Sequence, residues 1–283
     1  MCLAVGALAL AACAPKGSAG ADPSDALTAA VEKTLDSGSV RVAYGFSVRG
    51  AGVAFEIGGD AEVAFDPPTL HMSVEWPSFG PSQAAGEMEM ILTDEVAYLR
   101  APLLKDALGV ATPWVSVDAA TLGAASAELP GAGAGMSDPT RALRFLEGVT
   151  EVTEEGADTI DGRPATLYRA TVDLAKALRQ AAKEADVPAS AGDQMRELER
   201  QLGSHSKLPI DVWVADGYVV RVRVDYSIPS GQGMAEEVRL VMTANLSDFG
   251  ATFDISPPPA DEVTDVTKLV AAASRPHTVE VQG

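Results

Sequence analysis

The chain has 283 residues, of which 47% are hydrophobic, and 40 acidic against 21 basic residues give it a net charge of −19 at pH 7. This length allows one large domain with a sizeable core, and the acidity argues against binding to nucleic acids or charge-driven adhesion to anionic lipids. After the first thirteen residues, no run of the sequence approaches the roughly eighteen apolar residues of a transmembrane helix.

Both cysteines, Cys2 and Cys13, lie at the very beginning of the chain. Between them, residues 3–12 form an uncharged run of the length expected for the apolar core of a secretory signal, and this run is too short to span a bilayer. The positively charged segment that normally precedes such a core is missing. We expect residues 1–12 to be an export signal; the alternative is a buried apolar helix that happens to contain cysteine.

The segment Leu-Ala-Ala-Cys that ends at Cys13 resembles the lipobox of bacterial lipoproteins, in which a peptidase cleaves before a cysteine that carries diacylglycerol. Residues 1–12 would then be a lipoprotein signal peptide, and Cys13 the lipidation site. Loss of Cys2 leaves no thiol for a disulfide, a metal or catalysis. Two acyl chains give a stable anchor, so we expect a protein held on the extracytoplasmic face of the cell membrane, with no cofactor besides this covalent lipid.

Residues 13–23 are rich in Ala, Gly, Ser and Pro, which is typical of a flexible tether. The folded domain is expected over residues 24–283. It begins with a predicted helix from Ser24 to about Leu35, capped by Ser24 or Asp25.

After this helix, apolar residues recur at every second position instead of at the spacing of a helix. This alternation predicts strands with one apolar face, which we call the dry face. Glycines within the second of these strands indicate a bend. Closely spaced strands separated by turn residues predict an antiparallel meander. The expected strands cover residues 40–48, 53–65, 70–76, 88–92, 96–99 and 114–117.

The middle of the chain interrupts this pattern. Residues 119–138 are nearly all small and predict a flexible Ala/Gly-rich loop, followed by a helix that starts near Pro139. Strands over 151–158 and 165–172 are expected to form a hairpin at Asp161-Gly162. Residues 175–202 then predict a helical insertion of two helices.

The last third returns to strands over residues 210–214, 220–226 and 238–246, with a second Asp-Gly turn at Asp216-Gly217. A short helix is expected over 265–272. The predicted fold class is α+β: a single domain in which a large curved antiparallel sheet wraps over helices that cover its apolar face.

No residue pattern points to catalysis. His71, His205 and His277 are each expected to be solvated, and the sequence has no nucleophile elbow, Walker loop or zinc-binding helix motif. The acidic cluster at 261–265 lacks the spacing of a calcium loop and is better explained as helix caps. We therefore expect no metal site and no enzyme, and rank a hydrolase last among the possible functions.

The dry face of the sheet is the most informative feature, because it carries many large and flexible side chains. The alternation is equally consistent with a filled core packed against helices and with an apolar cavity. The residues expected to line such a cavity are Val42, Tyr44, Phe46, Phe55, Met72, Val74, Trp76, Met90, Leu92, Val212, Val222, Val224, Leu240 and Met242.

The order of these elements, with the segments at 159–168 and 208–217, resembles the LppX/LprG family of actinobacterial lipoproteins. The resemblance implies a LolA/LolB-like half-barrel whose apolar cavity accepts acyl chains of a lipid or glycolipid. The segments at 119–138 and 175–202 make this chain longer than the family pattern.

Two functions from different classes are consistent with this resemblance. The first is a membrane-anchored lipoprotein that binds a lipid and carries or presents it in the cell envelope without chemical change. Its further partner would be a membrane transporter or another envelope protein. The alternative is a signalling or scaffold lipoprotein that docks a protein partner through the same fold.

Overall fold

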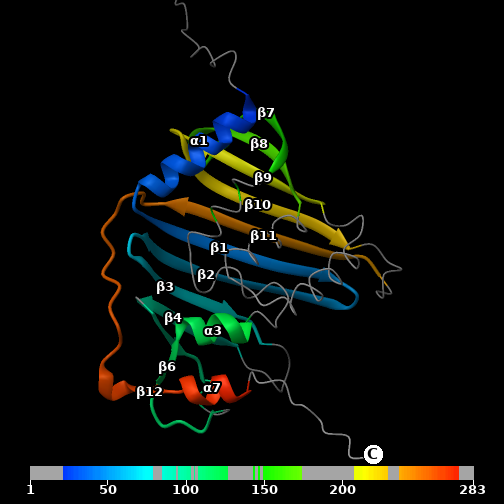
Figure 1. Cartoon of the computed structure of the whole chain (residues 1–283). Helices are drawn as coiled ribbons and strands as arrows, with labels where there is room; N and C mark the ends of the chain where they lie inside the picture. Colours follow the sequence, from blue (N-terminus) through cyan, green and yellow to red (C-terminus); the bar gives the residue numbers. More distant parts are fainter. Residues whose placement is uncertain are drawn as a thin grey trace, which may run out of the picture.

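The computed structural model describes residues 22–78, 85–93, 95–102, 105, 108–126, 143, 146, 149–173, 207–228 and 236–273. Their main element is one twelve-stranded sheet, shown with its few helices in Figure 1. The helices are α1 (Pro23–Asp36), α3 (Ala119–Ser126), η3 (Ala260–Glu262) and α7 (Thr267–Ala273). Among the described residues, no helix is long and apolar enough to cross a membrane.

The strands follow the predicted positions closely. They are β1 (Ser39–Gly50), β2 (Val53–Phe65), β3 (Pro68–Trp76), β4 (Gly86–Thr93), β5 (Val96–Arg100), β6 (Trp114–Asp118), β7 (Thr150–Ile160), β8 (Arg163–Asp173), β9 (Lys207–Ala215), β10 (Tyr218–Ile228), β11 (Val238–Ser247) and β12 (Val263–Asp265).

The sheet consists of two meanders joined at its centre. Its strand order is β12-β6-β5-β4-β3-β2-β1-β11-β10-β9-β8-β7, so β1 pairs with both β2 and β11. All these pairs are antiparallel except β12 with β6, which are parallel. The sheet is therefore mixed rather than purely antiparallel, because the chain after β11 crosses to the far edge before it adds β12 (Figure 1).

Both predicted Asp-Gly turns are confirmed. Asp161 and Gly162 have φ of 50° and 79°, and Asp216 and Gly217 have φ of 53° and 78°. Positive φ at both central residues characterises the tight turns whose twist matches that of the flanking strands. These turns fix the β7–β8 and β9–β10 hairpins.

The predicted first helix is confirmed, but its cap is wrong. Asp22, not Ser24 or Asp25, caps α1, and its carboxylate accepts a hydrogen bond of 2.9 Å from the Ser24 backbone N–H. Pro23 is the reason, because proline suits the first helical position and moves the start of the helix forward.

Helix α1 packs against β10 and β7 through a buried stripe. The Thr34 hydroxyl links helix and sheet: it donates to the Ala30 carbonyl oxygen at 2.7 Å and accepts from the Val219 backbone N–H at 3.0 Å. The buried helix residues are Leu27, Ala30, Val31 and Thr34. One end of the sheet is thus covered by a packed core.

The loop expected at 119–138 is wrong in its first part, since residues 119–126 form helix α3. The Asp118 carboxylate caps this helix by accepting from the backbone N–H of Thr121 at 2.8 Å. Alanine is the best helix former, so a capped Ala-rich segment becomes helical. Residues 127–138 and the insertion at 175–202 lie outside the described residues.

Of the two remaining helices predicted from the sequence outside the 175–202 insertion, the structure confirms one and describes only part of the other. Helix α7 confirms the expectation for 265–272, and the Asp265 carboxylate accepts from the Thr267 backbone N–H at 2.8 Å, as expected for a cap. The helix expected after Pro139 lies mostly outside the described part of the chain. Leu143 and Leu146, which belong to it, are buried in the main core.

The predicted bend of β2 coincides with a close contact at Gly59. This glycine pairs with Tyr44 on one side and with Val74 on the other. A Cβ atom at Gly59 would lie 1.9 Å from the Ser73 carbonyl oxygen and 2.7 Å from the Tyr44 hydroxyl oxygen. Only glycine lets the tyrosine side chain cross β2 to reach β3.

We predict that Gly59→Ala lowers the free energy of unfolding by about 1–3 kcal/mol, as overpacking does. Urea unfolding followed by circular dichroism measures this change. Gly45→Ala is the matched control, because a Cβ at Gly45 meets no atom within 4 Å, and its effect should stay within about 0.5 kcal/mol. Equal losses in the two variants would contradict the close contact.

Candidate functional site

The cavity residues predicted from the sequence all lie on one face of the sheet, which we call the inner face. Directly paired residues of antiparallel strands share a face, and Phe46 pairs with Met242, Tyr44 with Ala244, and Met72 with Met90. The remaining registers extend this face from β9 to β4. On it lie Val42, Tyr44, Phe46, Phe55, Met72, Val74, Trp76, Met90, Leu92, Val212, Val222, Val224, Leu240 and Met242.

The inner face is not uniformly buried. Met90, Leu92 and Val212 are 1%, 2% and 0% exposed and belong to the core. Met242, by contrast, is 48% exposed although it lies in the interior of the sheet, between Phe46 of β1 and Val224 of β10. The other cavity candidates are partly buried. The sequence predicted the face correctly, but only the structure separates its packed part from its open part.

Aromatic side chains mark the open part of the inner face. The rings of Phe46 and Phe55 lie with their centroids 6.1 Å apart and tilted by 56°, a favourable arrangement for an aromatic pair. Val53, at the start of β2, is also 48% exposed. Large apolar side chains therefore remain accessible to solvent where β1 and β2 meet.

Tyr44 contributes a polar group to the inner face. Its hydroxyl donates a hydrogen bond of 2.6 Å to the Ser73 carbonyl oxygen. Burial, and to a lesser degree the nearby charge of Asp60, raises the pKa of Tyr44 to about 12. The phenol is therefore neutral at physiological pH and serves as a structural tie between β1 and β3.

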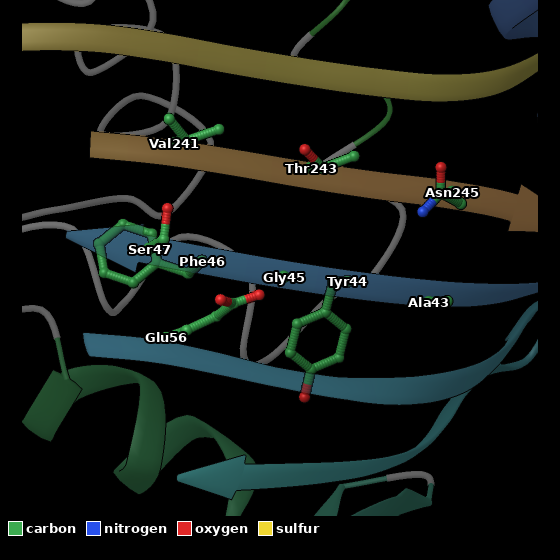
Figure 2. Close-up of a pocket in the computed structure, with 9 residues that line it drawn as sticks. All are labelled: Ala43, Tyr44, Gly45, Phe46, Ser47, Glu56, Val241, Thr243 and Asn245. Carbon is green, nitrogen blue, oxygen red and sulfur yellow. The ribbon is translucent and has the colours of Figure 1, made fainter. Parts of the chain in front are cut away.

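The pocket drawn in Figure 2 lies on the opposite, outer face. It has a volume of about 340 Å³ and forms over Gly45, whose missing side chain leaves a hollow between Ala43 and Ser47. Most of its lining residues pair with one another in the outer-face register, namely Ala43 with Asn245, Gly45 with Thr243, and Ser47 with both Val241 and Glu56. This polar hollow is not the apolar cavity predicted for the inner face.

Ion pairs occupy much of the outer face. Asp225 bonds Arg239 at 2.6 Å and Arg223 at 2.7 Å. Hydrogen bonding to Arg239 holds the pKa of Asp225 below its ordinary value. This part of the outer face is therefore a polar surface.

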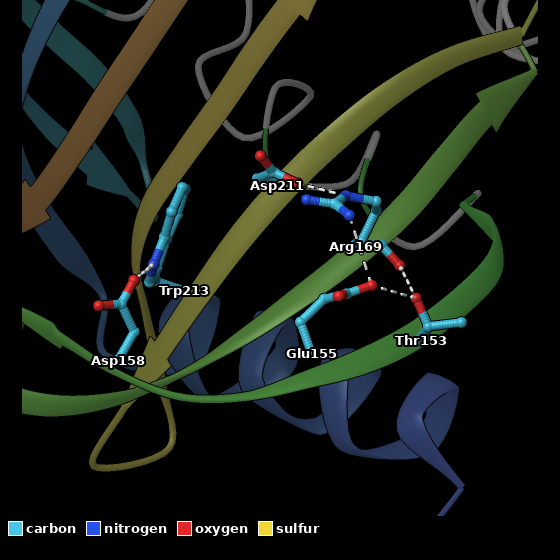
Figure 3. Close-up of polar contacts among 6 residues, drawn as sticks. All are labelled: Thr153, Glu155, Asp158, Arg169, Asp211 and Trp213. Carbon is cyan, nitrogen blue, oxygen red and sulfur yellow. Dashed lines mark hydrogen bonds and ion pairs between the residues drawn. The ribbon is translucent and has the colours of Figure 1, made fainter.

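A second group of polar contacts lies on β7, β8 and β9 (Figure 3). Arg169 bonds Asp211 at 3.0 Å and Glu155 at 3.5 Å, and the Trp213 indole N–H donates to the Asp158 carboxylate at 2.7 Å. The hydrogen bond from Trp213 lowers the pKa of Asp158. Arg169 and Trp213 are therefore held in ordinary structural pairs.

The polar groups considered for chemistry do not assemble into a site. His71 Nε2 lies 2.8 Å from the Glu89 carboxylate, which Arg100 also contacts. His205, His277 and Cys13 fall outside the described ranges. Within those ranges, no cluster of three or more His, Cys, Asp or Glu side chains could hold a metal ion. The open part of the inner face is the remaining candidate.

Comparison with known proteins gives matches only to solved structures, since no family model and no curated protein matches the chain. LprF from Mycobacterium bovis is similar over 84% of this chain and 97% of its own, with a TM-score of 0.51 and 18% identity. The lipoprotein LppX from Mycobacterium tuberculosis covers 82% of this chain and 99% of its own, with a TM-score of 0.44 and 15% identity. The MucA/MucB complex from Pseudomonas aeruginosa covers 85% of this chain and 60% of its own, with a TM-score of 0.33 and 11% identity.

The sheet with one apolar face and few helices thus has a counterpart among solved proteins. The chain belongs to the class of folds that consist of one open, largely antiparallel sheet. The particular fold is similar to that of LprF, which confirms the predicted resemblance at the level of the fold. Function still has to be argued from the site.

We predict that Tyr44→Phe changes how stability depends on pH. The phenol of an unfolded chain ionises near pH 10, whereas in the folded protein the pKa is about 12. Between these values the unfolded chain binds fewer protons, so wild-type stability falls as the pH rises. The variant lacks this contribution, and the stability advantage of the wild type should therefore shrink above about pH 10.

Urea unfolding at several pH values tests this expectation. Below about pH 9 the wild type should be more stable by about 0.5–1.5 kcal/mol, the usual net value of one hydrogen bond. Tyr98→Phe, on the outer face of β5, controls for the loss of a tyrosine hydroxyl. A constant difference between wild type and Tyr44→Phe across this pH range would contradict the assignment.

Proposed function

We propose that this protein is a lipoprotein that binds the acyl chains of a lipid on the open part of its inner face, and carries or presents that lipid in the cell envelope. The observation that carries the proposal is the 48% exposure of Met242 in the interior of an apolar sheet face. Exposed apolar patches of this kind mark interaction or ligand-binding sites. The similarity of the fold to that of LprF supports the resemblance to the LppX/LprG family, on which this proposal also draws.

The residues of the open face suit an acyl chain. Phe46, Phe55, Met72 and Met242 offer wide and adaptable apolar contact, since thioethers fit irregular partners. Within the described strands β1, β2 and β11, the charged side chains lie across the backbone on the outer face. A flexible hydrocarbon chain needs apolar contact and no fixed polar group, which is what these side chains provide.

The energetics favour exchange with a membrane. Burial of a sixteen-carbon chain contributes on the order of 12 kcal/mol at about 0.8 kcal/mol per methylene, before the cost of ordering the chain. A bilayer gives the same chain a similar gain. Transfer between protein and bilayer is therefore nearly balanced, while escape into water is strongly unfavourable.

The predicted anchor at Cys13 would hold the domain beside the bilayer. A net charge of −19 opposes adhesion to anionic lipids, so proximity would depend on the acyl chains of the anchor. We therefore propose that the carrier lies on the extracytoplasmic face of the cell membrane.

We predict that Met242→Glu reduces the amount of co-purified lipid at least tenfold, because it puts a charge on the open apolar face. Native mass spectrometry measures the bound lipid as extra mass that organic solvent removes. Val241→Glu is the matched control: it makes the same change at the next residue of β11, which lies on the outer face.

Two outcomes would count against the proposal. One is a wild-type protein that carries no lipid and extracts none from vesicles, which would favour the scaffold alternative. The other is equal lipid binding by the Met242→Glu and Val241→Glu variants, which would exclude the inner face as the site.

For the anchor, we predict that Cys13→Ser abolishes incorporation of labelled palmitate and releases the protein from the membrane fraction. Cys2→Ser is the control, since Cys2 lies in the predicted signal peptide and its loss should leave both readouts unchanged. Labelling in both variants, or in neither, would refute the assignment of Cys13 as the lipidated residue.

A further inference from the structure

The inner face is closed at the end of the sheet where β1 begins. There, directly paired residues of β1 to β6 form a row across the sheet, and each of them is at most 5% exposed. This end of the face is therefore a filled core, which we call the closed end. The row consists of Val40, Val63, Leu70, Leu92, Ala97 and Val117.

The Tyr44 ring separates the closed end from the residues beyond it. Tyr44 lies further along β1, and its side chain crosses β2 at Gly59 to reach the Ser73 carbonyl oxygen of β3, to which its hydroxyl donates at 2.6 Å. The hydrogen bond holds the ring in this position. On β1, β2 and β3 the ring is thus a fixed bar across the inner face.

Beyond this bar the inner face opens toward the hairpin that joins β1 and β2 (Figure 1). Met242, which pairs with Phe46, and Val53, which pairs with Gly50 at the hairpin, are both 48% exposed. Val238 is the exception at this end: it is 7% exposed and lies against Gly50, where a Cβ would be 2.9 Å from the Val238 Cα. Accessible apolar surface therefore continues from the middle of the sheet to the hairpin.

The length of this open stretch suits one acyl chain. From Tyr44 to Gly50 at the hairpin, β1 extends about 20 Å at roughly 3.4 Å per residue. An acyl chain in one leaflet of a bilayer covers about 15 Å, half of the hydrocarbon core. A chain that lies along β1 thus fits between the Tyr44 ring and the hairpin.

We propose that the acyl chain enters the inner face from the β1–β2 hairpin, with its terminal methyl group toward Tyr44 and its headgroup at the hairpin. The inference rests on the proposed function and gives the bound lipid a direction. The reverse direction would bring a polar headgroup to the filled core, where its desolvation is costly. At the hairpin the headgroup stays in water.

Paramagnetic broadening of methionine methyl signals tests this direction. The chain has eight methionines, of which Met72 lies near the closed end, level with Val42. Val53→Met adds an apolar reporter at the hairpin, about 27 Å away along β1 at roughly 3.4 Å per residue. The full-length protein in detergent binds phosphatidylcholine that carries a nitroxide either near the terminal methyl group or near the carbonyl group of one acyl chain.

The nitroxide near the terminal methyl group should remove the Met72 signal and leave that of the methionine introduced at position 53. The nitroxide near the carbonyl group should do the opposite. Substitution of each methionine by leucine assigns the signals. The reverse pattern, or equal broadening of both signals by both lipids, would overturn the inference and leave the proposed function in place.

A kinetic experiment tests the entrance separately. Val53→Glu places a charge at the hairpin end of the inner face, so we expect it to slow lipid uptake from phosphatidylcholine vesicles about tenfold. Ala54→Glu is the matched control, because the next residue of β2 is exposed on the outer face, where it pairs with Arg49. Equal uptake rates in the two variants would refute entry at the hairpin, whereas a wild type that takes up no lipid would refute both the inference and the proposed function.

Discussion

The pairing of β1 with both β2 and β11 is the constraint on which the rest of the structure depends. It joins two meanders into one sheet and sets a common register for their side chains. A slip of one residue at either seam would turn one half of the apolar face toward the opposite side. With the observed register, apolar side chains from β9 to β4 form one continuous surface.

A sheet of this width presents more apolar surface than the described helices cover. Helix α1 contacts β10 and β7, and α3 and α7 lie near β5 and β6 at the other end (Figure 1). The centre of the inner face, around Phe46 and Met242, lies between these two groups. The contrast between the buried Met90 and the exposed Met242 follows from this distribution of helices.

The sequence predicted the strands well because their signals are local. Alternation identifies each strand, and Asp-Gly dipeptides identify two of the turns. The predictions that were wrong also have identifiable physical causes. Pro23 shifted the cap of α1 to Asp22, and an Asp118 cap turned part of the expected loop into α3. Strand β12 has only three residues, and it pairs with a strand that lies far from it in the sequence.

The candidate site shows a different limit. Met90 and Met242 occupy equivalent places in alternating strands, so the sequence assigns both to the dry face, correctly. Their exposures of 1% and 48% depend on which distant segments pack over them. Local periodicity therefore predicts which face a residue lies on, whereas burial is a property of the assembled chain.

Two aromatic residues of the inner face each pack against a glycine of the neighbouring strand, but their polar groups differ in hydrogen bonding. Tyr44 crosses Gly59, and Trp76 lies against Gly86; in each case a glycine on the neighbouring strand makes room for the ring. The Tyr44 hydroxyl finds an acceptor in the Ser73 carbonyl, so this contact is complete within the protein and stabilises the sheet. The Trp76 donor finds none among the described residues. A glycine on the neighbouring strand therefore makes room for both rings, but only the Tyr44 contact is completed by a hydrogen bond within the described part of the chain.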